Sequence, residues 1–206
     1  MKAHTAESQA AIIPAEALQL LKEGNERFAN NRRLGRDLME QVSQTKTGQF
    51  PFATVLHCID SRVSAELLFD QGVGDVFSIR IAGNFVNEDI LGSMEFACKL
   101  AKTKLILVLG HSHCGAVKGA CDRVEMGNLT AMLSKITPAV DKIEQKFVHK
   151  GSMNAELVQA VADENVKNAI RQIREQSEIL NVMEAQGEIA IIGAMYNIET
   201  GVVSFS

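Results

Sequence analysis

Lys104-Leu105-Ile106-Leu107-Val108-Leu109 is a nearly continuous apolar run, and the polar cluster Gly110-His111-Ser112-His113-Cys114-Gly115 follows it directly. Short apolar runs that are rich in branched residues and end in turn signals are typical of strands covered on both faces. Two earlier runs, Thr54-Val55-Leu56-His57-Cys58 and Asp75-Val76-Phe77-Ser78-Ile79-Arg80, have the same pattern. The sequence therefore predicts three buried strands.

Helical patterns separate these runs, which favours a parallel sheet. One helix is predicted over Leu91–Leu100, and one long apolar stripe runs from Leu157 to Leu180. A fourth strand is predicted at Glu188–Gly193, with a hairpin into Val202–Phe205. The predicted fold class is α/β, a mainly parallel sheet of about four strands with an antiparallel edge strand and helices on both faces.

The N-terminal region is predicted to form a helical arm, residues 1–35, within a single domain that spans 1–206. Pro14 opens a helix expected to reach about Asn31, because proline in a first turn loses no internal hydrogen bond. The polar stretch Ser43–Gln49 is predicted as a loop. An acidic residue, Glu7, stands where a secretory signal needs its apolar stretch, so a cytoplasmic location is expected.

Composition excludes several classes of function. The 206 residues are 46% hydrophobic and 22% charged, with a formal charge of −4, so a folded domain is expected. The acidic balance gives no surplus of positive charge for nucleic acid or an anionic membrane. No apolar run approaches the roughly 18 residues of a spanning helix. A small-molecule substrate is therefore expected, with no nucleic acid and no membrane as partner.

Two clusters carry the predicted chemistry. Cys58-Ile59-Asp60-Ser61-Arg62 and Gly110–Gly115 each follow an apolar strand, and ligands of open α/β sheets collect at such carboxyl ends. Two thiolates and one imidazole suit zinc, and three protein ligands that leave one position open are typical of a catalytic site. Singly, a strand-end cysteine is more often a small buried hydrophobe, and an aspartate with an arginine a solvated pair. The combination favours a zinc site formed by Cys58, His111 and Cys114.

At this point the sequence resembles the β-class carbonic anhydrases, which have a Cys-x-Asp-Ser-Arg run and a Gly-His-x-x-Cys-Gly run around a catalytic zinc. The resemblance extends from about Ala15 to Phe205 and includes Arg80-Ile81-Ala82-Gly83-Asn84, Glu164-Asn165-Val166 and Gly193-Ala194-Met195-Tyr196. It implies reversible hydration of carbon dioxide to bicarbonate and a proton, a zinc lyase activity with one Zn²⁺ per subunit.

The resemblance also implies roles for single residues. Asp60 either takes the fourth zinc position or pairs with Arg62 and admits water, so both are expected to be catalytic. Gln49 and Gly115 are expected at the substrate, and Gln49 matches a glutamine that reaches the neighbouring subunit. The N-terminal helix is then expected to wrap a partner, as a homodimer or a dimer of dimers. Val55 stands where some members have a tryptophan of a regulatory bicarbonate pocket, so that switch is expected to be absent or altered.

Other residues of the sequence leave alternatives open. Proton-transfer candidates are His57, His113 and His149, none of them assigned, while Cys98 and Cys121 are expected to fill the core. The same scaffold admits carbonyl sulfide or carbon disulfide as substrate, decided by tunnel width. A zinc store or thiol redox sensor using Cys58 and Cys114 is the non-enzymatic alternative, and Asp60 with Arg62 argues against it.

Overall fold

The computed structural model describes residues 2–206 and contains a five-stranded sheet in the order β2-β1-β3-β4-β5. Strands β1 (Ala53–His57), β2 (Val76–Arg80), β3 (Leu105–His111) and β4 (Ala190–Tyr196) are parallel. Strand β5 (Val203–Phe205) pairs antiparallel with β4 after a turn in which Gly201 has a φ of +78°. The predicted mixed α/β sheet and its antiparallel edge strand are confirmed.

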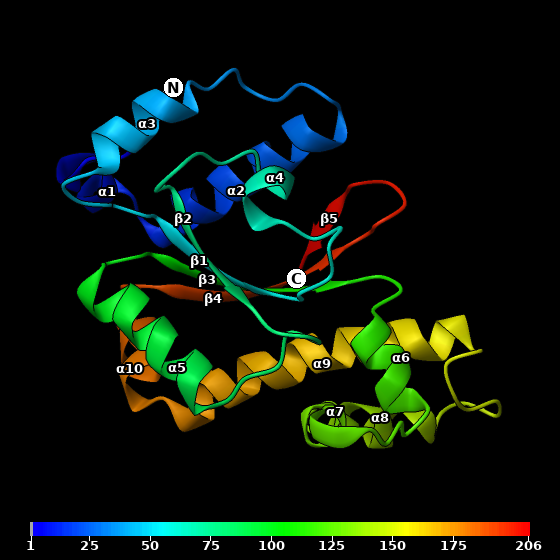
Figure 1. The fold of residues 1–206 in the computed structure, drawn as a ribbon. Coiled ribbons are helices and arrows are strands. Elements are labelled where there is room, and N and C mark those ends of the chain that lie inside the picture. The colour runs from blue at the N-terminus through cyan, green and yellow to red at the C-terminus, as the bar shows by residue number, and fades with distance from the viewer. Residues whose placement is uncertain (1) are drawn as a thin grey trace.

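Helices cover both faces of the sheet (Figure 1). On one side are α1 (Ala6–Ala11), α2 (Pro14–Ala29), α3 (Leu38–Thr45) and α4 (Ala65–Leu68). The other side carries α5 (Glu88–Glu95) with a π-helical turn (Phe96–Leu100), α9 (Ala155–Gln176) and α10 (Glu178–Ala185). Three short helices, α6 (Gly115–Cys121), α7 (Gly127–Leu133) and α8 (Thr137–Glu144), pack at one end of α9.

Alternation along β3 explains the two layers, because successive side chains of a strand point to opposite faces. Leu105, Leu107 and Leu109 pack with α2 and α4, whereas Ile106 and Val108 pack with α5, α9 and α10. All five side chains are fully buried. The continuous apolar run of the sequence is therefore the centre of both cores.

Several predicted boundaries are wrong. The long stripe from Leu157 is two helices, because Ser177 is extended and its hydroxyl accepts the Leu180 N–H that begins α10. The predicted Leu91–Leu100 helix changes to a π-helical turn, with an Ala101 N–H to Phe96 carbonyl bond. The predicted 43–49 loop begins inside α3, whereas the helix from Pro14 ends at Ala29, close to the predicted end near Asn31.

The N-terminal arm packs in part on its own chain. Ala17 and Leu21 of α2 are fully buried in the core, and the Gln9 amide of α1 donates to the carbonyls of Pro51 (2.6 Å) and Ala101 (2.8 Å). Met1, the first residue of the predicted 1–35 arm, lies outside the described residues. Among the described residues, no helix combines the length and apolarity that crossing a membrane requires.

Candidate metal centre

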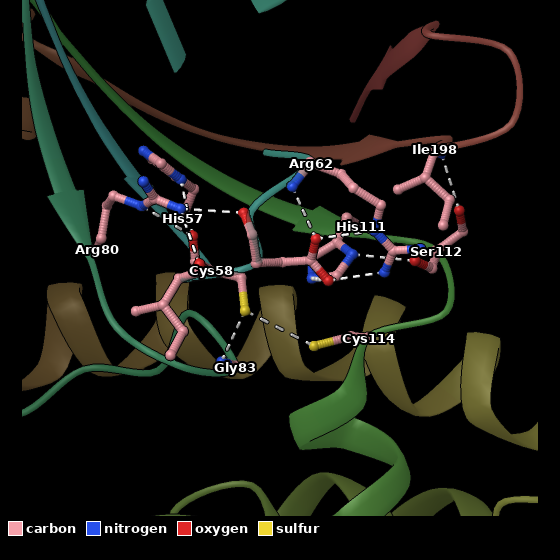
Figure 2. Close-up of polar contacts among 11 residues, drawn as sticks. His57, Cys58, Arg62, Arg80, Gly83, His111, Ser112, Cys114 and Ile198 are labelled. Atoms are coloured by element: carbon pink, nitrogen blue, oxygen red, sulfur yellow. Dashed lines mark hydrogen bonds and ion pairs between the residues drawn. The ribbon is translucent and has the colours of Figure 1, made fainter. Parts of the chain in front are cut away.

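The register of the sheet brings the two polar clusters together. His57 of β1 is the partner of Leu109 in β3, so the loops that follow both strands leave the same edge of the sheet. The ligand atoms of Cys58, His111 and Cys114 all lie within 4.8 Å of one another, and the three side chains are at most 4% exposed. Figure 2 shows them converging from β1, β3 and the start of α6. The predicted meeting of these three residues is confirmed.

The His111 ring is oriented as a metal ligand. Its Nδ1 lies 2.9 Å from the Ser112 carbonyl oxygen, which can only accept, so this nitrogen carries the proton. Its Nε2 is buried and has no hydrogen-bond partner within residues 2–206. Ser112 is itself fixed, because its N–H donates to the Tyr196 carbonyl and its hydroxyl accepts from the Ile198 N–H. An unpaired lone pair aimed at two thiols fits a cation.

The two thiols cannot both ionise without a cation. Their sulfur atoms are 4.0 Å apart. The Cys114 thiol and nearby backbone N–H groups hold the pKa of Cys58 well below its ordinary value. The Cys58 thiolate in turn raises the pKa of Cys114, as does burial. A divalent ion would remove this conflict, and the donor set of two sulfurs and one imidazole suits zinc.

Asp60 is held by Arg62 beside this cluster. The guanidinium donates from Nε to Oδ1 (2.9 Å) and from Nη2 to Oδ2 (2.7 Å), and the Arg62 backbone N–H donates to Oδ1 as well (3.0 Å). These bonds hold the pKa of Asp60 far below its usual range. Asp60 Oδ2 is 4.0 Å from His111 Nε2. Of the two expected arrangements of Asp60, the structure contains the pair with Arg62.

Arg80, the last residue of β2, fixes the loop that follows β1. Its guanidinium donates to the carbonyl oxygens of Cys58 (3.3 Å), Ile59 (2.8 Å) and Asp60 (3.0 Å). Sequence reasoning gave Arg80 no role. Its position in the sequence could have indicated this role, because Arg80 ends the strand next to β1 and is the register partner of His57.

Gly83 approaches the centre from the loop after β2, and its N–H lies 3.4 Å from the Cys58 sulfur. Its φ is +80°, and a Cβ would lie 2.4 Å from Ile136 Cδ1, so only glycine fits without strain. We expect Gly83→Ala to lower the free energy of unfolding by about 1–2 kcal/mol, as urea unfolding at matched zinc concentration would measure.

Gly92→Ala is the matched control for Gly83→Ala, because Gly92 lies inside α5 and a Cβ there would have no neighbour within 4 Å. It is expected to stabilise the protein by about 0.5–1 kcal/mol. Equal urea midpoints for Gly83→Ala and the unaltered protein would contradict the packing described for Gly83.

The remaining predicted site residues are Gln49 and Gly115. Gln49 is exposed and precedes β1. Gly115 begins α6 immediately after Cys114, and a Cβ there would meet no protein atom within 4 Å. Cys98 and Cys121 are buried in the core, as predicted.

The three histidines considered for proton transfer differ in surroundings. His57 is buried between the Cys58 carbonyl and the Ser78 hydroxyl, and burial, with the nearby Arg80 charge, lowers its pKa to about 4. His113 is half exposed and lies 3.2 Å from Glu199. His149 is in the loop before α9, where its carbonyl accepts from Asn154. His57 is therefore a poor proton carrier at neutral pH.

An α/β fold with a buried Cys-His-Cys centre beside a paired aspartate defines the class of a metal-dependent enzyme with an open ligand position. A sequence profile of the carbonic anhydrase family matches residues 53–203. The chain belongs to the carbonic anhydrase family, in its β class, and the resemblance seen in the sequence is confirmed.

Individual relatives agree with this assignment. Carbonic anhydrase 2 of Mycobacterium tuberculosis is 32% identical, and the match covers 91% of this chain and 90% of the relative. A carbonic anhydrase of Mycolicibacterium smegmatis is 33% identical and 91% of each chain is covered. The solved β-carbonic anhydrase CcaA is 28% identical with a TM-score of 0.70, covering 93% of this chain and 92% of that one. A Coccomyxa β-carbonic anhydrase in complex with acetazolamide is 27% identical with a TM-score of 0.72, covering 91% and 85%.

Proposed function

We propose that the chain hydrates carbon dioxide reversibly to bicarbonate and a proton, with zinc held by Cys58, His111 and Cys114. The observation that carries this proposal is the buried His111 Nε2, which has no hydrogen-bond partner among the described residues and faces the thiols of Cys58 and Cys114. The pKa of Cys58 is lowered and that of Cys114 is raised, as expected for two thiols that compete for one negative charge. When bound, zinc supplies a Lewis acid that activates water for attack on the carbon of the substrate. The test is CO2 hydration by zinc-quantified protein.

Asp60 and Arg62 have separate tasks in this proposal. An ionised carboxylate only accepts hydrogen bonds, so Asp60 accepts from the attacking water and aims it at the substrate. The two guanidinium bonds hold the ionised Asp60, so that it would leave the remaining position of a bound zinc to water. The product proton then passes to solvent buffer.

Gln49 is proposed to complete the site of a second subunit. It precedes β1, whereas Cys58 follows the other end of that strand, and five strand residues separate the two ends by roughly 15 Å. Gln49 therefore cannot serve the metal centre of its own chain without a large rearrangement. The N-terminal region also exposes apolar side chains, which suits burial against another copy: Ile13, Leu38, Met39 and Val42.

Mixing one impaired and one inactive variant tests this arrangement. Gln49→Ala keeps the zinc ligands and is expected to lose about 10-fold in kcat/KM, because one substrate hydrogen bond is removed. Cys58→Ser keeps Gln49 and has no working zinc site. In a mixed dimer one site combines the intact ligands of the first chain with Gln49 of the second, so refolding the variants together is expected to restore activity. Mixed dimers no more active than the sum of the separate variants would contradict a shared site.

We further propose a homodimer or a dimer of dimers in the cytoplasm. A reducing compartment suits this centre, because two thiols with sulfurs 4.0 Å apart could form a disulfide whenever zinc is lost. Gly115, adjacent to Cys114, is proposed to contact the substrate.

A further inference from the structure

Asn165 is a buried polar residue in the middle of α9. Its side chain is 3% exposed and its neighbours Val161, Ala162 and Ala169 on the same helix are buried and apolar. A buried amide in such surroundings is stable only when it is hydrogen-bonded. The Asn165 amide donates to the Gly83 carbonyl oxygen at 2.7 Å, across 82 residues of sequence.

Gly83 connects Asn165 to the metal centre. The N–H of the same residue points at the Cys58 sulfur, 3.4 Å away, in the contact drawn as a dashed line in Figure 2. Ile136 and Ala116 lie close to its Cα, at 2.4 Å and 3.2 Å from the place of a Cβ, so they form a wall against one side of the residue. The amide of Asn165 restrains the same residue from its carbonyl side.

We propose that Asn165 is a positioning residue for the Cys58 thiolate, acting through Gly83. A hydrogen bond to a thiolate draws negative charge away from the sulfur, so the thiolate donates less charge to a bound metal. Holding the Gly83 N–H in place thus keeps the metal a stronger Lewis acid. This inference rests on the proposed ligand Cys58.

Packing alone does not explain why an asparagine stands at position 165. An aliphatic side chain would fill the same volume between α9 and the loop after β2 without needing a partner, and the adjacent Glu164 already ties α9 to α8 through Lys142 (2.6 Å). The amide is needed only where a carbonyl must be held. That carbonyl belongs to the residue whose N–H faces the thiolate.

Cobalt-substituted protein offers a readout that fold stability alone does not move. Asn165→Ala removes the donor, and Asn165→Leu removes it with a side chain of similar length that has no polar atom, so the second variant serves where the first folds poorly. Asn168→Ala is the matched control, because Asn168 is also a buried asparagine of α9 but pairs with Arg171. The sulfur-to-cobalt charge-transfer band and the rate of zinc release to a chelator are measured for each protein.

Both Asn165 variants are expected to shift the charge-transfer band to lower energy, because a thiolate without its hydrogen bond is a stronger donor. They are also expected to release zinc about 10-fold faster, because the loop that orients Cys58 is no longer held. Asn168→Ala is expected to match the unaltered protein. An unchanged band in both Asn165 variants, or an equal shift in Asn168→Ala, would overturn the proposal. Cobalt bound to the unaltered protein with no thiolate band would instead overturn the ligand assignment of Cys58.

Discussion

Replacing Cys58 by serine is expected to abolish zinc binding and CO2 hydration together. The serine hydroxyl does not ionise near neutral pH, and only His111 and Cys114 would remain as ligands. Because the reaction needs water activated by the metal, activity is expected to fall by about 1000-fold or more. Zinc per chain, measured by atomic absorption, and stopped-flow hydration of CO2 check both parts.

Cys98→Ser is the control for this experiment. Cys98 is another buried cysteine, and its sulfur contacts the Thr103 hydroxyl at 3.4 Å. It belongs to a different core cluster from Cys58 and Cys114. It is expected to keep one zinc per chain and its activity. Full zinc and full activity in Cys58→Ser would show that the ligand set is wrong.

Replacing Arg62 by alanine is expected to lower activity while zinc stays bound. The guanidinium is the largest cause of the low pKa of Asp60, so its loss raises that pKa toward the ordinary range. At neutral pH the carboxylate remains ionised but is no longer held, and it lies 4.0 Å from His111 Nε2, within reach of the fourth metal position. It then competes with water there.

This competition gives a pH signature. The loss in kcat/KM is expected to be about 10- to 100-fold at pH 7 and smaller in alkaline solution, where ionised water competes better with the carboxylate. Arg174→Ala is the matched control, because Arg174 makes a similar two-bond pair with Glu184 away from the site. Unchanged hydration in Arg62→Ala would refute the assigned role, and loss of zinc with activity would make Arg62 a structural residue.

The parts of the site that the sequence predicted are those set by strand ends. Cys58 and His111 follow apolar runs, and adjacent parallel strands must bring such loops to one edge. The Asp60 and Arg62 pair was also predicted, but as two residues on one side of an extended loop. The structure forms the pair in a turn, in which the Val63 N–H donates to the Asp60 carbonyl oxygen and the Arg62 N–H to the Asp60 carboxylate.

The supporting contacts were not predictable, because they depend on how distant segments pack. Nothing local in α9 indicates that Asn165 meets the Gly83 carbonyl, and nothing in β2 shows Arg80 reaching three carbonyls of another loop. The end of α9 at Ser177 was missed for a related reason. The apolar stripe continues across the break, and only the bond from the Leu180 N–H to the serine hydroxyl reveals a new helix.

The most direct test of the account is stopped-flow CO2 hydration as a function of pH, on protein with one zinc per chain. Asp60 held by Arg62 would leave the remaining position of a bound zinc to water, so activity is predicted at neutral pH without a further activating step. Activity confined to alkaline pH would contradict the open arrangement of Asp60. Zinc-loaded protein without hydration at any pH would contradict the proposed function itself.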